Sequence, residues 1–107
     1  MIRQISATEL KDRLDSADAA PFLLDVREPQ EFAYCRIEGA VSIPLGELPR
    51  RAPELPADRD IVAICHHGSR SLQAAAFLQQ QHGLEVANLQ GGVAAWARDV
   101  DPSMKQY

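Results

Sequence analysis

The chain contains little cysteine, and this scarcity excludes several classes of protein. Its 107 residues include only Cys35 and Cys65, with no CxxC pair and no HExxH motif. Small disulfide-stapled domains need several paired cysteines, so this chain is not one of them, and a reducing compartment is expected. Two histidines adjoin Cys65, but adjacent side chains rarely converge on one tetrahedral metal ion. We therefore expect no metal site.

Long apolar runs and an excess of positive charge are also missing. No stretch reaches the roughly 18 apolar residues that suggest a membrane-spanning helix, and the first six residues are too mixed for a signal peptide. The net charge is -4 and the pI is about 5.2. Proteins that bind nucleic-acid backbones instead present clustered Lys and Arg. We expect a cytoplasmic protein that binds neither membranes nor nucleic acids.

Short apolar segments alternate with segments of helical character along the chain. Apolar runs bounded by Pro, Gly or charge predict strands at 22–26, 39–43, 61–64 and 86–89. Helices are predicted at 6–16, 28–32, 71–81 and 93–98; the first begins with a capping box and the third stops at Gly83. The proline-rich stretch between the second and third strands is predicted to form a surface connection or a pair of helical turns.

This alternation indicates an α/β fold. We expect a small, mainly parallel central sheet flanked by helices on both faces. A hydrophobic content of 46% over 107 residues suits one domain spanning 1–107, because two domains would each be too small for a core. The polar tail from residue 99 onward is expected to wrap the surface or fray.

Chemically active side chains follow two of the predicted strands. Asp25 and Cys65 stand at carboxyl ends of strands, where sites gather in parallel sheets. The loop after Cys65 consists of His66, His67, Gly68, Ser69, Arg70 and Ser71. Backbone N–H groups of a tight loop and of a helix N-terminus favour a thiolate, which is the nucleophilic form of cysteine. Cys65 is therefore a candidate nucleophile, although many buried cysteines near strands are inert.

The rest of the loop suits the binding of an anion. Gly68 permits a sharp turn, and Ser69 and Ser71 supply hydroxyl donors to an anionic sulfur or to substrate oxygens. Arg70 can hold a sulfonate or carboxylate through two hydrogen bonds. His66 and His67 either add positive potential and tune the thiol or are merely permissive loop side chains.

Five motifs, in order, resemble those of the rhodanese-like domain family. The loop 65–71 is similar to the family's C-x-x-G-x-R-S active-site loop, and 25–28 to its D-V-R-E segment. Residues 36–40 resemble H-I-x-G-A, 42–45 resemble N-I-P-L, and 89–92 with Trp96 resemble L-x-G-G followed by Trp. The ending, with Asp101-Pro102 and Tyr107, resembles rhodanese domains that relay sulfur to sulfur-carrier proteins.

The resemblance implies a sulfurtransferase that works through a persulfide on Cys65 and needs no cofactor. It implies small sulfur-containing anions such as thiosulfate as donors, and a thiophilic acceptor that can be a sulfur-carrier protein. The alternative is a sulfur-relay or interaction module with little turnover of its own. Related phosphatases have one more residue between Cys and Arg, whereas four residues separate Cys65 from Arg70 here, which favours sulfur over phosphate.

Residues outside the loop have supporting roles in this interpretation. Asp25 is expected to accept hydrogen bonds from the loop or from Arg70, and Arg27 to form a structural ion pair. Cys35 and Arg36 depart from the family, which usually has Gly and His at these places, and this leaves open how the segment before Gly39 is held. Cys35 either resolves a Cys65 persulfide as a disulfide or is buried and inert.

Overall fold

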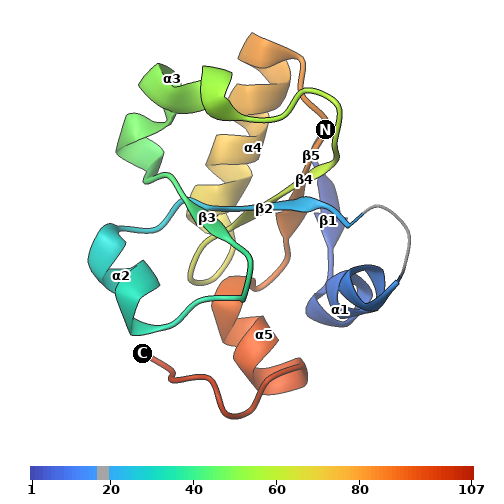
Figure 1. The fold of residues 1–107 in the computed structure, drawn as a ribbon, viewed down its shortest axis with the longest axis vertical. Coiled ribbons are helices and arrows are strands. Elements are labelled where there is room, and N and C mark those ends of the chain that lie inside the picture. Colours follow the sequence, from blue (N-terminus) through green and yellow to red (C-terminus); the bar gives the residue numbers. More distant parts are fainter. Residues whose placement is uncertain (17–19) are drawn as a thin grey trace.

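A five-stranded parallel sheet forms the centre of the protein (Figure 1). The computed structural model describes residues 1–16 and 20–107. The strands are β1 (Arg3–Ile5), β2 (Phe22–Asp25), β3 (Val41–Ser42), β4 (Ile61–Ile64) and β5 (Val86–Leu89). Their order in the sheet is β1-β5-β4-β2-β3, and all described pairings are parallel. The predicted α/β fold class is thereby confirmed.

Helices connect the strands and cover both faces of the sheet. They are α1 (Ala7–Asp15), α2 (Pro29–Tyr34), α3 (Leu48–Arg51), α4 (Ser69–His82) and α5 (Gly92–Asp99), with short 3-10 turns at Leu45–Glu47 and Ala52–Glu54. Helices α1 and α5 pack together on one face, and α3 and α4 lie on the other (Figure 1). No helix in the described part of the chain has the length and apolar character needed to cross a membrane.

Two apolar cores separate cleanly because successive strand side chains point to opposite faces. Ala63 in β4 packs into the core under α3 and α4, whereas its neighbours Val62 and Ile64 pack into the core under α1 and α5. All four residues of β4 are buried. Burial on both faces explains the uninterrupted apolar sequence 61–64 and places β4 in the middle of the sheet.

Three differences from the predicted elements concern the sheet edges and the active-site turn. The edge strand β1 was not predicted, because only one of its three residues, Ile5, is buried. Strand β3 is shorter than predicted, with two residues at the opposite edge. Helix α4 begins at Ser69 instead of residue 71, because Gly68 adopts a positive φ of 107° and caps the helix. Ser69 and Arg70 therefore belong to the helix and not to the preceding loop.

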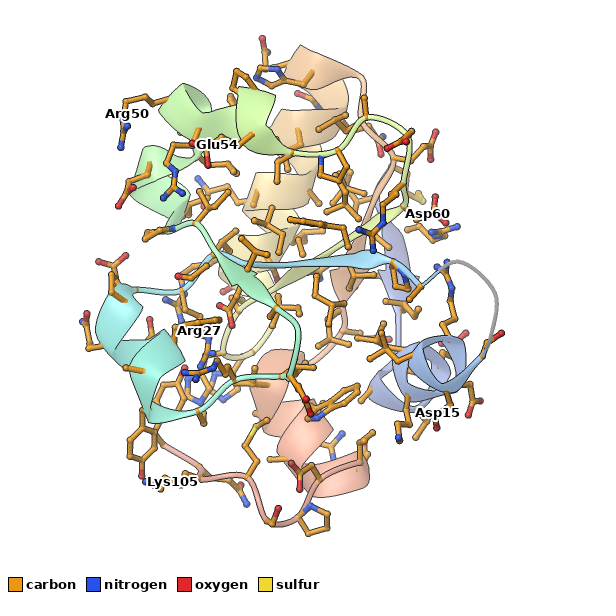
Figure 2. The ribbon with its side chains drawn as sticks, in the orientation of Figure 1. Asp15, Arg27, Arg50, Glu54, Asp60 and Lys105 are labelled. Carbon is orange, nitrogen blue, oxygen red and sulfur yellow. The ribbon has the colours of Figure 1, made fainter. Side chains whose placement is uncertain are left out.

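Figure 2 shows how the side chains occupy this frame. Trp96 and Leu78 lie in the core, and Phe22 and Phe77 are partly buried against it. The carboxyl ends of β2 and β4 lie side by side, because Asp25 is paired in register with Ile64. This register brings Asp25 and the residue after Ile64 to one edge of the sheet.

Candidate active site

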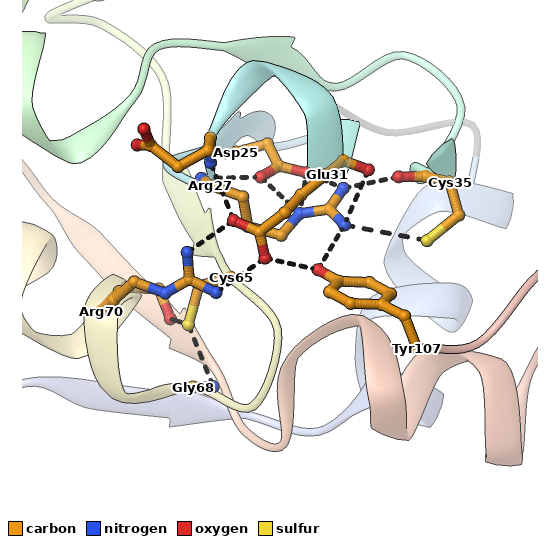
Figure 3. Close-up of polar contacts among 10 residues, drawn as sticks. Asp25, Arg27, Glu31, Cys35, Cys65, Gly68, Arg70 and Tyr107 are labelled. Atoms are coloured by element: carbon orange, nitrogen blue, oxygen red, sulfur yellow. Dashed lines mark hydrogen bonds and ion pairs between the residues drawn. The ribbon is translucent and has the colours of Figure 1, made fainter. Parts of the chain in front are cut away.

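The Cys65 side chain lies directly after β4, enclosed by the turn that leads into α4. Its thiol is free and the residue is 1% exposed. The backbone N–H of Gly68 donates to Cys65 Sγ at 3.1 Å, and Ser71 Oγ lies 3.3 Å from the same sulfur (Figure 3). The turn thus wraps the sulfur with polar groups from the first turn of α4 and from the residue that caps it.

The N-terminus of α5 holds the outer side of this turn. Val93 N donates to the carbonyl of Cys65 at 2.9 Å, and Ala94 N donates to the carbonyl of His66 at 3.1 Å. A Cβ atom on Gly92 would overlap both carbonyl oxygens, and Gly92 has a positive φ of 61°. Glycine at this position therefore allows α5 to approach and bind the carbonyls of the active-site turn.

A buried amide connects the turn to two other elements. Asn88, 2% exposed, donates from Nδ2 to the carbonyl of Gly68 at 3.1 Å and to Gln4 Oε1 at 2.9 Å. Since a backbone carbonyl only accepts, Asn88 Oδ1 must face Ser71 Oγ, which is 2.5 Å away. The Ser71 hydroxyl has one proton and gives it to Asn88. Ser71 therefore turns a lone pair toward Cys65.

A buried ion pair stands behind the turn. Arg27 and Asp25 are both 0% exposed, and Arg27 Nη2 lies 2.7 Å from Asp25 Oδ2. Arg27 also donates to the carbonyl of Cys35 at 2.7 Å and to the Tyr107 hydroxyl at 2.9 Å. Burial opposes the charge on Arg27, but the bonds to Asp25 and Tyr107 raise its pKa above the ordinary value. The guanidinium is therefore a structural cation.

A second ion pair lies at the opening of the site. Arg70 Nη1 and Nη2 bind the two carboxylate oxygens of Glu31 at 2.7 and 3.0 Å (Figure 3). The Tyr107 hydroxyl donates to Glu31 Oε2 at 2.8 Å, and Glu28 N donates to Oε1 at 2.9 Å. The bonds from Arg70 outweigh burial and lower the pKa of Glu31 to about 2. Glu31 is therefore ionised near pH 7.

The two loop histidines form a stack with the last residue. The His66 ring lies 3.8 Å from His67 and 3.8 Å from Tyr107, the latter almost parallel at 9°. Burial, and then the neighbouring His67, lower the pKa of His66. His66 is thus neutral near pH 7, and the polar tail wraps over the active-site turn instead of fraying.

These contacts settle where the predicted side chains lie. The Cys65 sulfur is contacted by Gly68 N and Ser71 Oγ, whereas Ser69 is exposed. The partner of Asp25 is wrong in the prediction: the hydrogen bonds described for Asp25 come from Arg27, and not from the turn or Arg70. The expected structural ion pair of Arg27 is confirmed. The turn's backbone N–H groups were expected to surround the Cys65 sulfur, and one of them, from Gly68, donates to it.

Three contributing residues were missed from the site: Glu31, Asn88 and Tyr107. The only sequence signals were a polar residue near the end of a buried strand, for Asn88, and the family-like ending, for Tyr107. Cys35 is buried and free, with Arg27 Nη1 at 3.7 Å from its sulfur. Arg36 donates to the carbonyl of Phe32 at 3.2 Å and lies over its ring, so it ties the segment before Gly39 to α2.

Comparison with known proteins gives a consistent result. Residues 6–99 match the family described as Rhodanese-like domain. The chain is 43% identical over 99 residues to a protein named Sulfurtransferase from Allochromatium vinosum, covering 92% of this chain and 91% of that one. It is 37% identical over 101 residues to the putative sulfurtransferase YtwF of Bacillus subtilis, covering 94% and 96%.

Two further similarities concern a longer relative and a solved structure. The chain is 41% identical over 95 residues to the putative sulfur carrier protein YrkF of Bacillus subtilis, covering 89% of this chain and 51% of that protein. A crystal structure of a rhodanese-related protein from Thermoplasma volcanium superimposes with a TM-score of 0.83 at 35% identity, covering 92% of this chain and 93% of the other.

Proposed function

Because the chain belongs to the rhodanese-like domain family, we propose that it moves a sulfane sulfur through a persulfide on Cys65. Two relatives of the chain, named a sulfurtransferase and a putative sulfurtransferase, support this proposal. The donor is an anion such as thiosulfate and the acceptor is thiophilic. The observation that carries this proposal is the Cys65 sulfur at the carboxyl end of β4, held by Gly68 N–H and facing Ser71.

The transfer takes place in two displacement steps. The Cys65 thiolate attacks the outer sulfur of thiosulfate, a new S–S bond forms, and the bond to the sulfonate sulfur breaks so that sulfite leaves with the electron pair. The product is Cys65–S–S⁻. A nucleophilic acceptor such as cyanide or a thiolate then attacks the outer sulfur, and Cys65 leaves as the thiolate. The chain's own part is to hold the sulfur, with the backbone N–H of Gly68 donating a hydrogen bond to it.

Mass spectrometry of the Cys65 peptide tests this proposal. After incubation with thiosulfate and desalting, the peptide should gain the mass of one sulfur atom, and cyanide should remove it with release of thiocyanate. The variant Cys65→Ser should keep its fold by circular dichroism and lose turnover, with Cys35→Ser as the control that keeps it. Turnover of thiosulfate by Cys65→Ser would overturn the proposal.

A second candidate function is sulfur relay to or from a partner protein with little free turnover. Arg70 is already paired with Glu31 and is not free for a small anion, which favours a donor positioned by protein docking. The relative named a putative sulfur carrier protein points the same way. A persulfide that forms from a cysteine desulfurase or a persulfidated carrier, but only slowly from thiosulfate, would identify this function.

Phosphate-ester hydrolysis is the outcome that both candidates exclude. The turn from Cys65 to Arg70 contains four intervening residues, and its polar groups close around one sulfur atom. No release of p-nitrophenol from p-nitrophenyl phosphate is expected.

A cytoplasmic location is part of the same proposal, because Cys65 must stay reduced to act and both cysteines are free.

A further inference from the structure

We propose that Glu31 determines which sulfur donors this site accepts, by withholding Arg70 from small anions. The inference rests on the proposed sulfur transfer at Cys65. It names the class of donor that the site favours: sulfane sulfur presented on a thiol, as a persulfide, in preference to a free dianion such as thiosulfate. Figure 3 shows the Glu31 carboxylate between Arg70 and Tyr107, with hydrogen bonds to both.

Arg70 is the cation beside the reactive sulfur that an entering anion could use. Its side chain is 35% exposed, and its electrostatic interaction with Cys65 helps to raise its pKa. Both of its terminal nitrogens are engaged by Glu31 in a bidentate pair. The pairing with Glu31 also raises the pKa of Arg70, so the pair stays fully charged. An anion must therefore displace a carboxylate in order to bind Arg70.

Glu31 is held in place by groups other than Arg70. The Tyr107 hydroxyl and Glu28 N donate to its two oxygens, and its side chain is only 17% exposed. A carboxylate fixed by separate donors loses little entropy when it binds Arg70, so the pair is stronger than an ordinary surface salt bridge. Displacement by a mobile anion from solution is correspondingly unfavourable.

The second guanidinium near the site offers no alternative. Arg27 is 0% exposed, and its nitrogens are bound by Asp25, the carbonyl of Cys35 and the Tyr107 hydroxyl. His66 is neutral near pH 7 because burial lowers its pKa. Lys105 is exposed, with its ammonium 5.4 Å from the centre of the Tyr34 ring. A dianion such as thiosulfate thus finds Arg70 already paired with Glu31 and can bind only the N–H groups of the turn. A persulfide donor needs only these N–H groups.

Binding measurements in a non-reacting background test the proposal without any turnover. Thiosulfate is titrated by calorimetry into Cys65→Ser and into Cys65→Ser/Glu31→Gln. The glutamine side chain keeps the shape of the glutamate but offers Arg70 one neutral oxygen, so thiosulfate should bind at least about tenfold more tightly, the worth of a charge-assisted hydrogen bond. Tyr107→Phe, which removes one donor to Glu31, should tighten binding by a smaller factor.

Three controls separate this role from a general effect. Glu38→Gln removes the same charge from an exposed position and should leave thiosulfate binding unchanged. Addition of Arg70→Gln to the Cys65→Ser/Glu31→Gln protein should abolish the gain in thiosulfate affinity. With Cys65 intact, Glu31→Gln should lower KM for thiosulfate and leave KM for the persulfide of uncharged 2-mercaptoethanol unchanged, with Cys65 persulfidation as the readout.

The outcomes distinguish failure of this proposal from failure of the proposed function. Equal thiosulfate affinity in Cys65→Ser and in Cys65→Ser/Glu31→Gln, or a gain that persists without Arg70, would overturn the role of Glu31. Absence of persulfide on the wild-type protein with either donor would contradict the proposed function alone, because the calorimetric result does not depend on chemistry at Cys65.

Discussion

Asp25 and Arg27 form an ion pair from which water is excluded, two residues apart at the end of β2. Three hydrogen bonds of 2.7 to 3.1 Å join the guanidinium to the carboxylate, and both side chains are 0% exposed. Buried charges are tolerated only when each has its partner. Arg27 also donates hydrogen bonds to the Tyr107 hydroxyl and to the carbonyl of Cys35, so the pair holds two further segments of the site in place.

Arg27→Met should therefore destabilise the protein severely. The substitution leaves Asp25 as a buried, unpaired charge, and the free energy of unfolding should fall by about 3–5 kcal/mol in urea titrations. The double variant Asp25→Leu/Arg27→Met removes both charges and should recover at least about 2 kcal/mol of this loss. The matched exposed variant Arg98→Met should change the stability little. Equal loss in the single and double variants would show that the charge is not the cause.

Gly92→Ala tests the contact between α5 and the active-site turn. The added methyl group would overlap the carbonyls of Cys65 and His66, and the residue would be held at a positive φ. We expect a loss of more than about 2 kcal/mol in the free energy of unfolding, together with a large drop in Cys65 persulfidation. Gly46→Ala, where a Cβ meets nothing within 4 Å, is the control. A fully stable and active Gly92→Ala protein would contradict the contact.

Asn88→Leu tests the hydrogen bond that takes the proton of Ser71. Without the Asn88 oxygen, the Ser71 hydroxyl is free to donate to the Cys65 sulfur and so to stabilise the thiolate. One hydrogen bond of about 1 kcal/mol corresponds to roughly fivefold faster alkylation by iodoacetamide at neutral pH. In the Ser71→Ala background the same substitution should have no effect. A slower reaction in Asn88→Leu would mean that Asn88 acts only by holding Gly68.

Ionised Glu31 should make the free energy of unfolding depend on pH in the acid range. Its pKa in the folded protein, about 2, lies below the ordinary 4.5, so its contribution is fully present above pH 4.5 and disappears as the pH falls toward 2. Chemical unfolding across this range should show a steeper loss for the wild type than for Glu31→Gln. Screening at the open side of the site limits the difference to about 1 kcal/mol. If the free energies of unfolding of the wild type and of Glu31→Gln change in parallel with pH, the Glu31–Arg70 ion pair is not the source of the acid sensitivity.

The sequence was most informative where the determining interactions are local. The β-branched run 61–64 predicted β4 because burial on both faces demands apolar residues at every position. The capping box at Ser6 and Glu9 is present at the start of α1. Gly68, Cys65 and Ser71 lie within seven consecutive residues, so the spacing alone brought them to one turn.

Partners that are distant in sequence could not be predicted in the same way. Glu31 and Arg70 are 39 positions apart, and Asn88 and Gln4 are 84 apart. Their contacts depend on the strand order, on the register between β4 and β2, and on an edge strand too polar to be recognised. Asp25 was assigned to the wrong partner for a different reason: Arg27 is only two positions away, and side-chain packing decides which arginine meets the carboxylate.

The turn around Cys65 has a consequence for sequence variation. Its sulfur accepts a hydrogen bond from Gly68 N–H and its outer carbonyls accept hydrogen bonds from Val93 and Ala94, so main-chain groups hold much of the turn. The side chains of His67 and Ser69 are exposed, and His67 stacks on His66 outside the hydrogen bonds described around the sulfur. A library randomised at these two positions should retain sulfur chemistry in most members. Such exchangeable positions offer natural selection, or an engineer, a way to alter what docks beside the thiol without rebuilding the centre.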